Sequence, residues 1–338
     1  IGRVLMPGMV LQSVIVGGAY GTGREVVQWV TSQGPFGGLL TGLVMVAAMA
    51  ITLFLSYEIV RRRQVIDYRS FFRLLLGRFW WLYEVMFVLG LVLILAIGGA
   101  AAGEILEDRF GWSPMLGVAA MFLITVVLNY LGRDWVDRTL ASWGVLMSLL
   151  LAALVLWVCL RSFPEIAAHI AGGQDVSAAP LASGLRFYLY SAFIIPPTLF
   201  AAAGLKSRRE CAWAGLLGGI LVTLPAFAYH LAFLSQYPQV LEQSLPTYWL
   251  LQQLGKPALI TLYTAVLFVT IAQTGAGVLQ GLNERLDRWS IERRGRGLSR
   301  TVHGANAALA LLASLLLAKV GIVTLVAQGY GSIAWISL

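Results

Sequence analysis

Ten long apolar segments, joined by short connections, account for most of this 338-residue chain. A helix needs about 20 apolar residues to cross the hydrocarbon core of a bilayer. Charged residues make up only 12% of the chain, whereas soluble domains carry about 25%. This pattern predicts an all-α polytopic membrane protein that has no separate soluble domain. The predicted spans are 7–30, 37–60, 81–104, 114–131, 135–160, 183–204, 212–235, 257–283, 301–318 and 320–338.

The basic residues lie mainly on alternate connections between the spans. Of the 24 Lys and Arg residues, 18 fall on one set of connections and five on the other, and Arg24 lies inside a span. Cytoplasmic loops carry such an excess of Lys and Arg, so both termini are expected in the cytoplasm. The net charge of +8 is therefore explained by the lipid bilayer as partner, and no nucleic-acid surface is predicted.

Two connections are expected to be structured. Residues 68–81 alternate apolar and basic residues at helical spacing, which predicts an interfacial helix on the cytoplasmic side. Residues 237–257 combine prolines with short apolar runs, which predicts a helical hairpin that caps the outer face.

The spans divide into two halves, residues 1–162 and 177–338, each predicted to hold five spans. Because five is odd, the second half is inserted upside down relative to the first. The first span of each half is interrupted, by "GGAYGTG" in one and by "SAFIIPPT" in the other. A single interruption is typical of helix packing, but matched interruptions in inverted halves favour a central binding site in a secondary transporter.

The interruption in the first span is followed directly by two charged residues, Arg24 and Glu25. Neighbours on a helix point about 100° apart, so the two side chains do not simply pair. Arg24 can hold a substrate carboxylate, replace an ion or pair with a carboxylate on another span. Glu25 is a candidate proton carrier. Both residues can equally form structural ion pairs or face a water-filled vestibule.

Enzyme signatures are missing from the sequence. It contains no Gly-x-Ser-x-Gly, no His-Glu-x-x-His and no phosphate-binding loop, and its two cysteines are isolated. We therefore expect neither an enzyme nor an organic cofactor.

The order of these features resembles the LeuT fold of the amino acid–polyamine–organocation superfamily. The shared features are five plus five inverted spans, interruptions in spans 1 and 6, the interfacial helix and the capping hairpin. Within that group, "GGAYGTGRE" followed by "GPFGG" resembles the uncharacterised YkvI-like bacterial membrane proteins. The resemblance implies a multi-pass protein of the bacterial inner membrane.

The resemblance also implies an ion site. In sodium-coupled relatives, two carbonyls of the first interruption and hydroxyl groups in span 8 bind Na⁺, which here correspond to Gly17 and Tyr20 and to Gln273 and Thr274. A second sodium site in those relatives depends on an asparagine where this chain has Arg24. The resemblance therefore implies that the second ion is absent and that Arg24 takes its electrostatic place. Na⁺ and H⁺ are both candidate coupling ions.

The substrate site implied by the resemblance lies between the two interruptions. Relatives bind a substrate carboxylate through backbone N–H groups, which correspond to Thr22 and Gly23. The candidate substrate-binding residues are Gly21, Thr22, Gly23, Arg24, Glu25, Tyr190, Ser191, Phe193 and Ile194. The expected function is ion-coupled symport of a small organic solute, an amino acid or related carboxylate, by alternating access. The alternative is a channel or a transporter-like sensor on the same scaffold.

Overall fold

The computed structural model describes residues 2–15, 18–172 and 179–336, and every regular element within them is helical. Seven of these helices are long and apolar enough to cross a membrane. They match seven of the predicted spans, and α13 continues well beyond the predicted end at residue 283. The seven are α4 (Pro35–Arg63), α6 (Trp81–Phe110), α7 (Pro114–Leu131), α8 (Arg133–Arg161), α11 (Arg208–Leu234), α13 (Pro257–Arg294) and α14 (Arg300–Ala318).

The three other predicted spans are interrupted. The first consists of α1 (Gly2–Ile15), α2 (Gly18–Gly21) and α3 (Arg24–Trp29), and the sixth of α10 (Ala179–Ala192) and the 3₁₀ helix η3 (Pro196–Gly204). Both interruptions are the ones that the sequence predicts. The last span is also irregular, which the sequence did not indicate. Its elements are α15 (Ile322–Thr324), the π-helical η5 (Leu325–Tyr330) and α16 (Gly331–Ile336).

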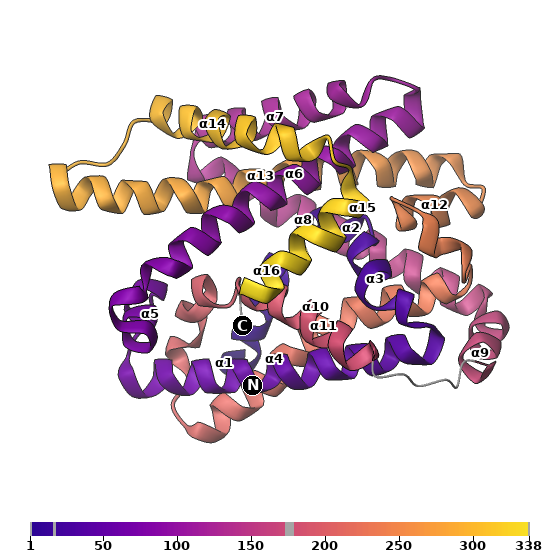
Figure 1. Ribbon diagram of the computed structural model, residues 1–338, viewed down its shortest axis with the longest axis horizontal. Coiled ribbons are helices and arrows are strands. Elements are labelled where there is room, and N and C mark those ends of the chain that lie inside the picture. The colour runs from indigo at the N-terminus through magenta and orange to yellow at the C-terminus, as the bar shows by residue number, and fades with distance from the viewer. Residues whose placement is uncertain (1, 16–17, 173–178, 337–338) are drawn as a thin grey trace.

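The long helices form two groups with the interrupted ones between them (Figure 1). In one group α4 packs along α11, and both α1 and α10 pack against this pair. In the other, α6, α7, α13 and α14 pack against one another, and α8 packs against α13. The interrupted segments therefore lie where the two groups meet.

Short helices mark the two ends of the molecule. At one end lies α5 (Tyr68–Leu76), which is followed by η2 (Gly77–Phe79); we call this end the basic side. At the opposite end lie η4 (Gln239–Glu242) and α12 (Pro246–Gln253), which form the predicted hairpin; we call this end the hairpin side (Figure 1). The hairpin side also carries α9 (Phe163–Gly172), a helix in a connection where the sequence predicted none.

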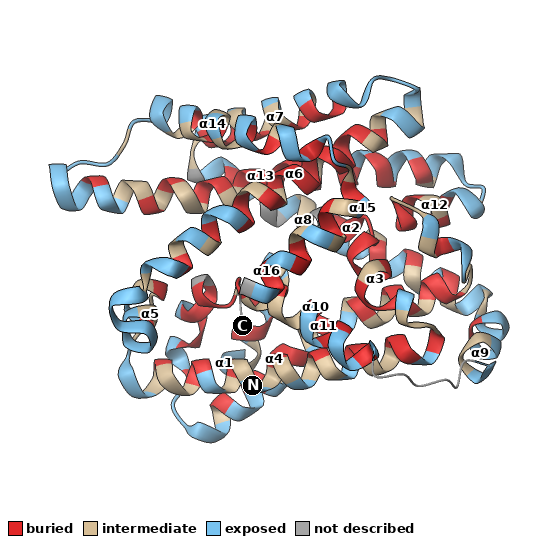
Figure 2. Cartoon of the chain, viewed as in Figure 1, coloured by how far each residue is buried: buried red, intermediate tan, exposed pale blue. Residues whose placement is uncertain are grey.

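The long helices are apolar on their outward faces as well as inside. Leu160 and Leu316 are each more than 70% exposed, and Figure 2 shows exposed residues along the outer surfaces and buried ones at the centre. Exposed leucine at this density is unfavourable in water and favourable in lipid. The fold is that of a polytopic membrane protein.

Helices α6 and α7 approach each other closely at Gly117. A Cβ atom at this position would lie 2.2 Å from the carbonyl oxygen of Ala102 and 2.8 Å from the Cα of Gly103. Small residues at such crossings are characteristic of membrane helix pairs, because they allow backbone-to-backbone contact.

Replacing Gly117 by alanine is expected to lower the melting temperature of the detergent-solubilised protein, because α6 and α7 would have to separate. The matched control is Gly99→Ala on α6, where the new Cβ would lie 3.4 Å from the nearest heavy atom, an ordinary contact. Thermal unfolding followed by tryptophan fluorescence measures both. Equal melting temperatures for the two variants would contradict the close approach.

Candidate functional site

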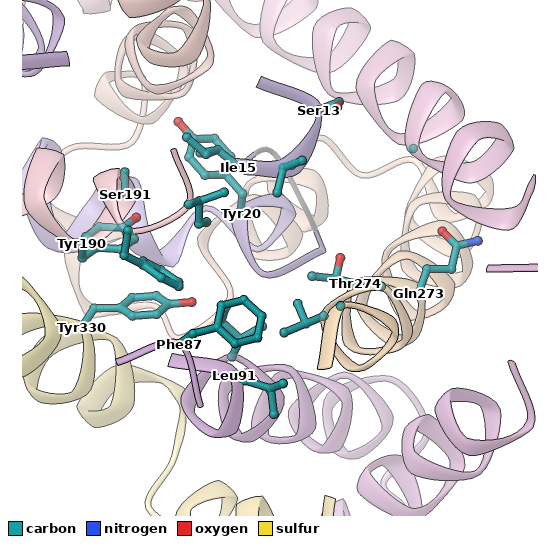
Figure 3. Close-up of a pocket in the computed structure, with 18 of the residues that line it drawn as sticks. Ser13, Ile15, Tyr20, Phe87, Leu91, Tyr190, Ser191, Gln273, Thr274 and Tyr330 are labelled. Carbon is teal, nitrogen blue, oxygen red and sulfur yellow. The ribbon is translucent and has the colours of Figure 1, made fainter. Parts of the chain in front are cut away.

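A cavity of about 510 Å³ lies where the interrupted segments meet, a size that suits a small organic ligand. Its walls come from α1, α2, α3, α5, α6, α8, α10, α13 and η5, together with the residues that interrupt the sixth span (Figure 3). Eight of the predicted site residues line it: Tyr20, Glu25, Tyr190, Ser191, Phe193, Ile194, Gln273 and Thr274. The structure thus brings together residues from both interruptions and from the long helix α13.

Glu25 is the carboxyl group in the central part of the cavity, and it is 5% exposed. The Tyr190 hydroxyl donates a hydrogen bond to its Oε2 atom at 2.5 Å, and the Tyr330 hydroxyl is a second hydrogen-bonding partner. The Tyr190 and Tyr330 rings stack with centroids 4.5 Å apart and planes 7° apart (Figure 3). Three interrupted segments therefore meet at one carboxyl group.

Tyr330 was not among the residues predicted from the sequence. It ends the π-helical turn of η5, and π-helical turns frequently occur at functional sites because they shift the register of the side chains that follow. The glycines on either side of it, in "QGYGS", are the local sequence signal that accompanies this irregularity.

The cavity extends from Glu25 to the basic side. Its lining there includes Tyr68, Glu284, Arg285 and the exposed Arg288. Arg285 is held in place, because its Nη1 lies 3.1 Å from Oε2 of Glu84, whose Oε1 accepts a hydrogen bond from Tyr68 at 2.7 Å. The mouth of the cavity thus carries charges of both signs.

On the hairpin side of the cavity, Arg24 ties the first span to the hairpin. Its Nη1 donates to the carbonyl oxygens of Leu241 at 3.1 Å and Gln243 at 2.9 Å, and its Nη2 donates to Gln28 Oε1 at 3.0 Å. The Glu104 carboxyl group on α6 also interacts electrostatically with this guanidinium. Arg24 therefore holds the hairpin closed over the site.

The carbonyl groups released at the first interruption have partners from other helices. Gly21 O accepts from the hydroxyls of Tyr263 at 2.6 Å and Tyr229 at 3.2 Å, and Thr22 O accepts from Thr247 N at 3.1 Å. The last of these bonds is a second link between the first span and the hairpin.

Gly23 makes the turn between α2 and α3. Its φ of 79° is in the left-handed region, and a Cβ would lie 2.5 Å from both Phe233 Cζ and Thr247 Oγ1. Its N–H donates to Tyr20 O at 3.0 Å, and the N–H of Arg24 donates to Thr22 Oγ1 at 3.2 Å. Both conformation and space therefore require glycine here.

The remaining predicted site residues lie away from the cavity wall or outside the described residues. Gly21, Thr22, Gly23 and Arg24 contact the hairpin and its supporting tyrosines instead of lining the cavity. Gly17, a predicted sodium ligand, lies outside the described residues. Thr274 lines the cavity across from Tyr190 and Tyr330 (Figure 3), and its hydroxyl donates to Thr270 O at 3.0 Å.

The fold is similar to that of known transporters. No protein-family model and no curated protein sequence matches the chain. A Na⁺-coupled sialic acid symporter, solved substrate-bound and outward-open, matches with a TM-score of 0.61 at 12% identity over 99% of this chain and 75% of its own. A manganese transporter from Eremococcus coleocola, solved with an aromatic bis-isothiourea compound, matches with a TM-score of 0.55 at 13% identity over 98% and 74%. At these identities the comparison establishes a LeuT-like transporter fold.

Removing the Arg24 side chain is expected to open the hairpin side. In a chain whose two cysteines are replaced by alanine, Thr247→Cys places a thiol on the buried face of the hairpin helix α12, where Thr247 is 0% exposed. Adding Arg24→Ala should raise the rate of labelling by a membrane-impermeant maleimide about tenfold or more, because several charge-assisted hydrogen bonds are lost.

The matched control for this experiment is Arg161→Ala, which removes the same charge from an exposed position at the hairpin end of α8. It should leave the labelling rate unchanged. Size-exclusion profiles identify any variant that does not fold. An unchanged rate in folded Arg24→Ala protein would show that the hairpin does not depend on this residue.

Proposed function

We propose that this protein is an ion-coupled secondary transporter, a symporter, of a small organic solute and works by alternating access. The observation that carries the proposal is the central cavity, which is bounded by two interrupted helices, reaches the basic side and is covered on the hairpin side by the Arg24 contacts. A site that is accessible from one side and covered on the other is what alternating access requires. The fold shared with two transporters supports the same conclusion.

The orientation follows from the charges. The basic side carries most of the Lys and Arg residues, and the positive-inside rule makes it cytoplasmic. We therefore infer an inward-facing state, in a bacterial inner membrane. The Na⁺-coupled symporter with a similar fold was solved outward-open. We infer that the hairpin and Arg24 separate when this chain adopts the corresponding state.

A channel is disfavoured by the closure on the hairpin side. Two independent links, from Arg24 and from the Thr22 carbonyl, join the first span to the hairpin there. A conducting pore needs a continuous path, whereas this cavity is open at one end.

The protein reconstituted in liposomes should accumulate its solute above the external concentration when a Na⁺ or H⁺ gradient is imposed. The natural solute is found by testing a panel of labelled amino acids, carboxylates and amines against protein-free liposomes. Glu25→Gln, which removes the central carboxyl group at nearly constant volume, should abolish the accumulation. Flux that only equilibrates the solute would indicate a channel. Binding without flux would indicate a sensor.

If Na⁺ is the coupling ion, Thr274 is expected to be one of its ligands, because its hydroxyl lies on the cavity wall across from the interrupted first span. Replacing K⁺ by Na⁺ should then raise the melting temperature of the detergent-solubilised protein, and Thr274→Ala should abolish that rise.

The matched control for the ion experiment is Thr264→Ala on the same helix. The Thr264 hydroxyl also donates to a backbone carbonyl one turn earlier, that of Ile260, but the residue does not line the cavity. This variant should keep the Na⁺ effect. A Na⁺ effect that survives in Thr274→Ala would place the ion elsewhere, and no Na⁺ effect in the unmodified protein would favour H⁺.

A further inference from the structure

The central part of the cavity holds an acidic side chain, Glu25. Glu25 takes part in none of the ion pairs found among the described residues. The neighbouring guanidinium of Arg24 is bound to the hairpin carbonyls. Arg285 and Arg288 are the described arginines that line the cavity, and both belong to its mouth on the basic side, where Glu284 and the Glu84 partner of Arg285 offset them.

A carboxyl group at membrane depth ionises readily only beside a positive partner, because an isolated charge is costly in a low-dielectric environment and the unpaired group stays protonated. The hydrogen bond donated by Tyr190 lowers this cost without neutralising the charge. The Glu25 carboxyl group forms part of the cavity wall, so a ligand in the cavity can supply the positive partner.

Aromatic rings line the cavity together with this carboxyl group. Tyr20, Tyr190, Phe193 and Tyr330 are the rings concerned, and Figure 3 shows Tyr190 and Tyr330 stacked on one side of the cavity. Aromatic rings next to a carboxylate bind organic ammonium groups, because ring faces attract cations and ring edges pack against the apolar body of the ligand. Much of the remaining wall is aliphatic, including Ile15, Leu91 and Val278.

The same geometry offers little to a carboxylate. The N–H groups expected to bind a carboxylate are those of Thr22 and Gly23, but neither residue lines the cavity, and the Gly23 N–H is bonded to Tyr20 O. A negatively charged ligand group in the cavity would also be repelled by Glu25. The site is therefore suited to a ligand that has a positive charge and no negative one.

We propose that the central cavity binds a small organic amine in its protonated form, with the ammonium group against Glu25 and an apolar or aromatic body among Tyr20, Phe193, Tyr190 and Tyr330. This inference rests on the proposed transport function, because it names the class of solute that would be carried. The expected solute becomes an organic monocation in place of the amino acid or carboxylate that the sequence resemblance implied.

The test uses four probes that share one phenyl-ethyl body: 2-phenylethylamine, phenylalanine, 3-phenylpropionate and 2-phenylethanol. Each is titrated into the protein in detergent, and binding is measured by calorimetry and by the rise in melting temperature. The amine should bind about tenfold or more tightly than each of the other three, because it alone pairs with the buried carboxylate without adding a negative charge.

Glu25→Gln should remove the preference for the amine while the variant keeps its size-exclusion profile. The matched control is Glu107→Gln, which makes the same change at an exposed position at the hairpin end of α6 and should bind the amine normally. Tighter binding of phenylalanine or phenylpropionate, equal binding of all four probes, or no binding of any would overturn the inference.

The binding and uptake measurements distinguish failure of the proposed ligand class from failure of the proposed transport function. Selective binding of the amine without gradient-driven uptake would support the ligand class and contradict the transporter. Gradient-driven uptake of a zwitterion or an anion, with no selective binding of the amine, would support the transporter and contradict the ligand class.

Discussion

The need to satisfy backbone polar groups inside a membrane governs this structure. Wherever a helix is interrupted at membrane depth, its released N–H and C=O groups must find partners in protein, water or ligand. At the first interruption, Tyr263, Tyr229 and the Thr247 amide supply partners for the carbonyls of Gly21 and Thr22. At the second, the Tyr83 hydroxyl donates to Phe193 O at 2.9 Å. The interruptions are thus possible only because α6, α11, α13 and the hairpin surround them.

The adjacent residues Arg24 and Glu25 contact different parts of this arrangement. Both residues lie on α3, and adjacent side chains on a helix point in different directions. Arg24 therefore reaches the hairpin, and Glu25 faces the cavity. The arginine contributes to closure on the hairpin side, and the glutamate supplies the acidic group of the cavity. A rearrangement of α3 would therefore act on the closure and on the cavity at the same time.

Much of the fold was predictable because membrane helices are strongly constrained by length and hydrophobicity. The predicted span 114–131 coincides with α7, and the interruptions at "GGAYGTG" and "SAFIIPPT" appear where glycine and proline weaken a helix. Two features were not predicted. Helix α9 is too short to give a spanning signal, and the π-helical turn at Tyr330 depends on packing against neighbouring segments more than on local residue preference.

The sequence by itself determined that the chain is an all-helical membrane protein, which segments are interrupted, and that Glu25 and the residues near Tyr190 are candidates for one site. Hydrophobic length and the helix-weakening residues are local properties, so they can be read along the chain. Only the tertiary structure decided that Arg24 binds the hairpin carbonyls, that Tyr330 joins Tyr190 at Glu25, and that the cavity reaches the basic side. These contacts join residues that lie up to 305 positions apart in the chain, between Glu25 and Tyr330, and they depend on how the two groups of helices pack together.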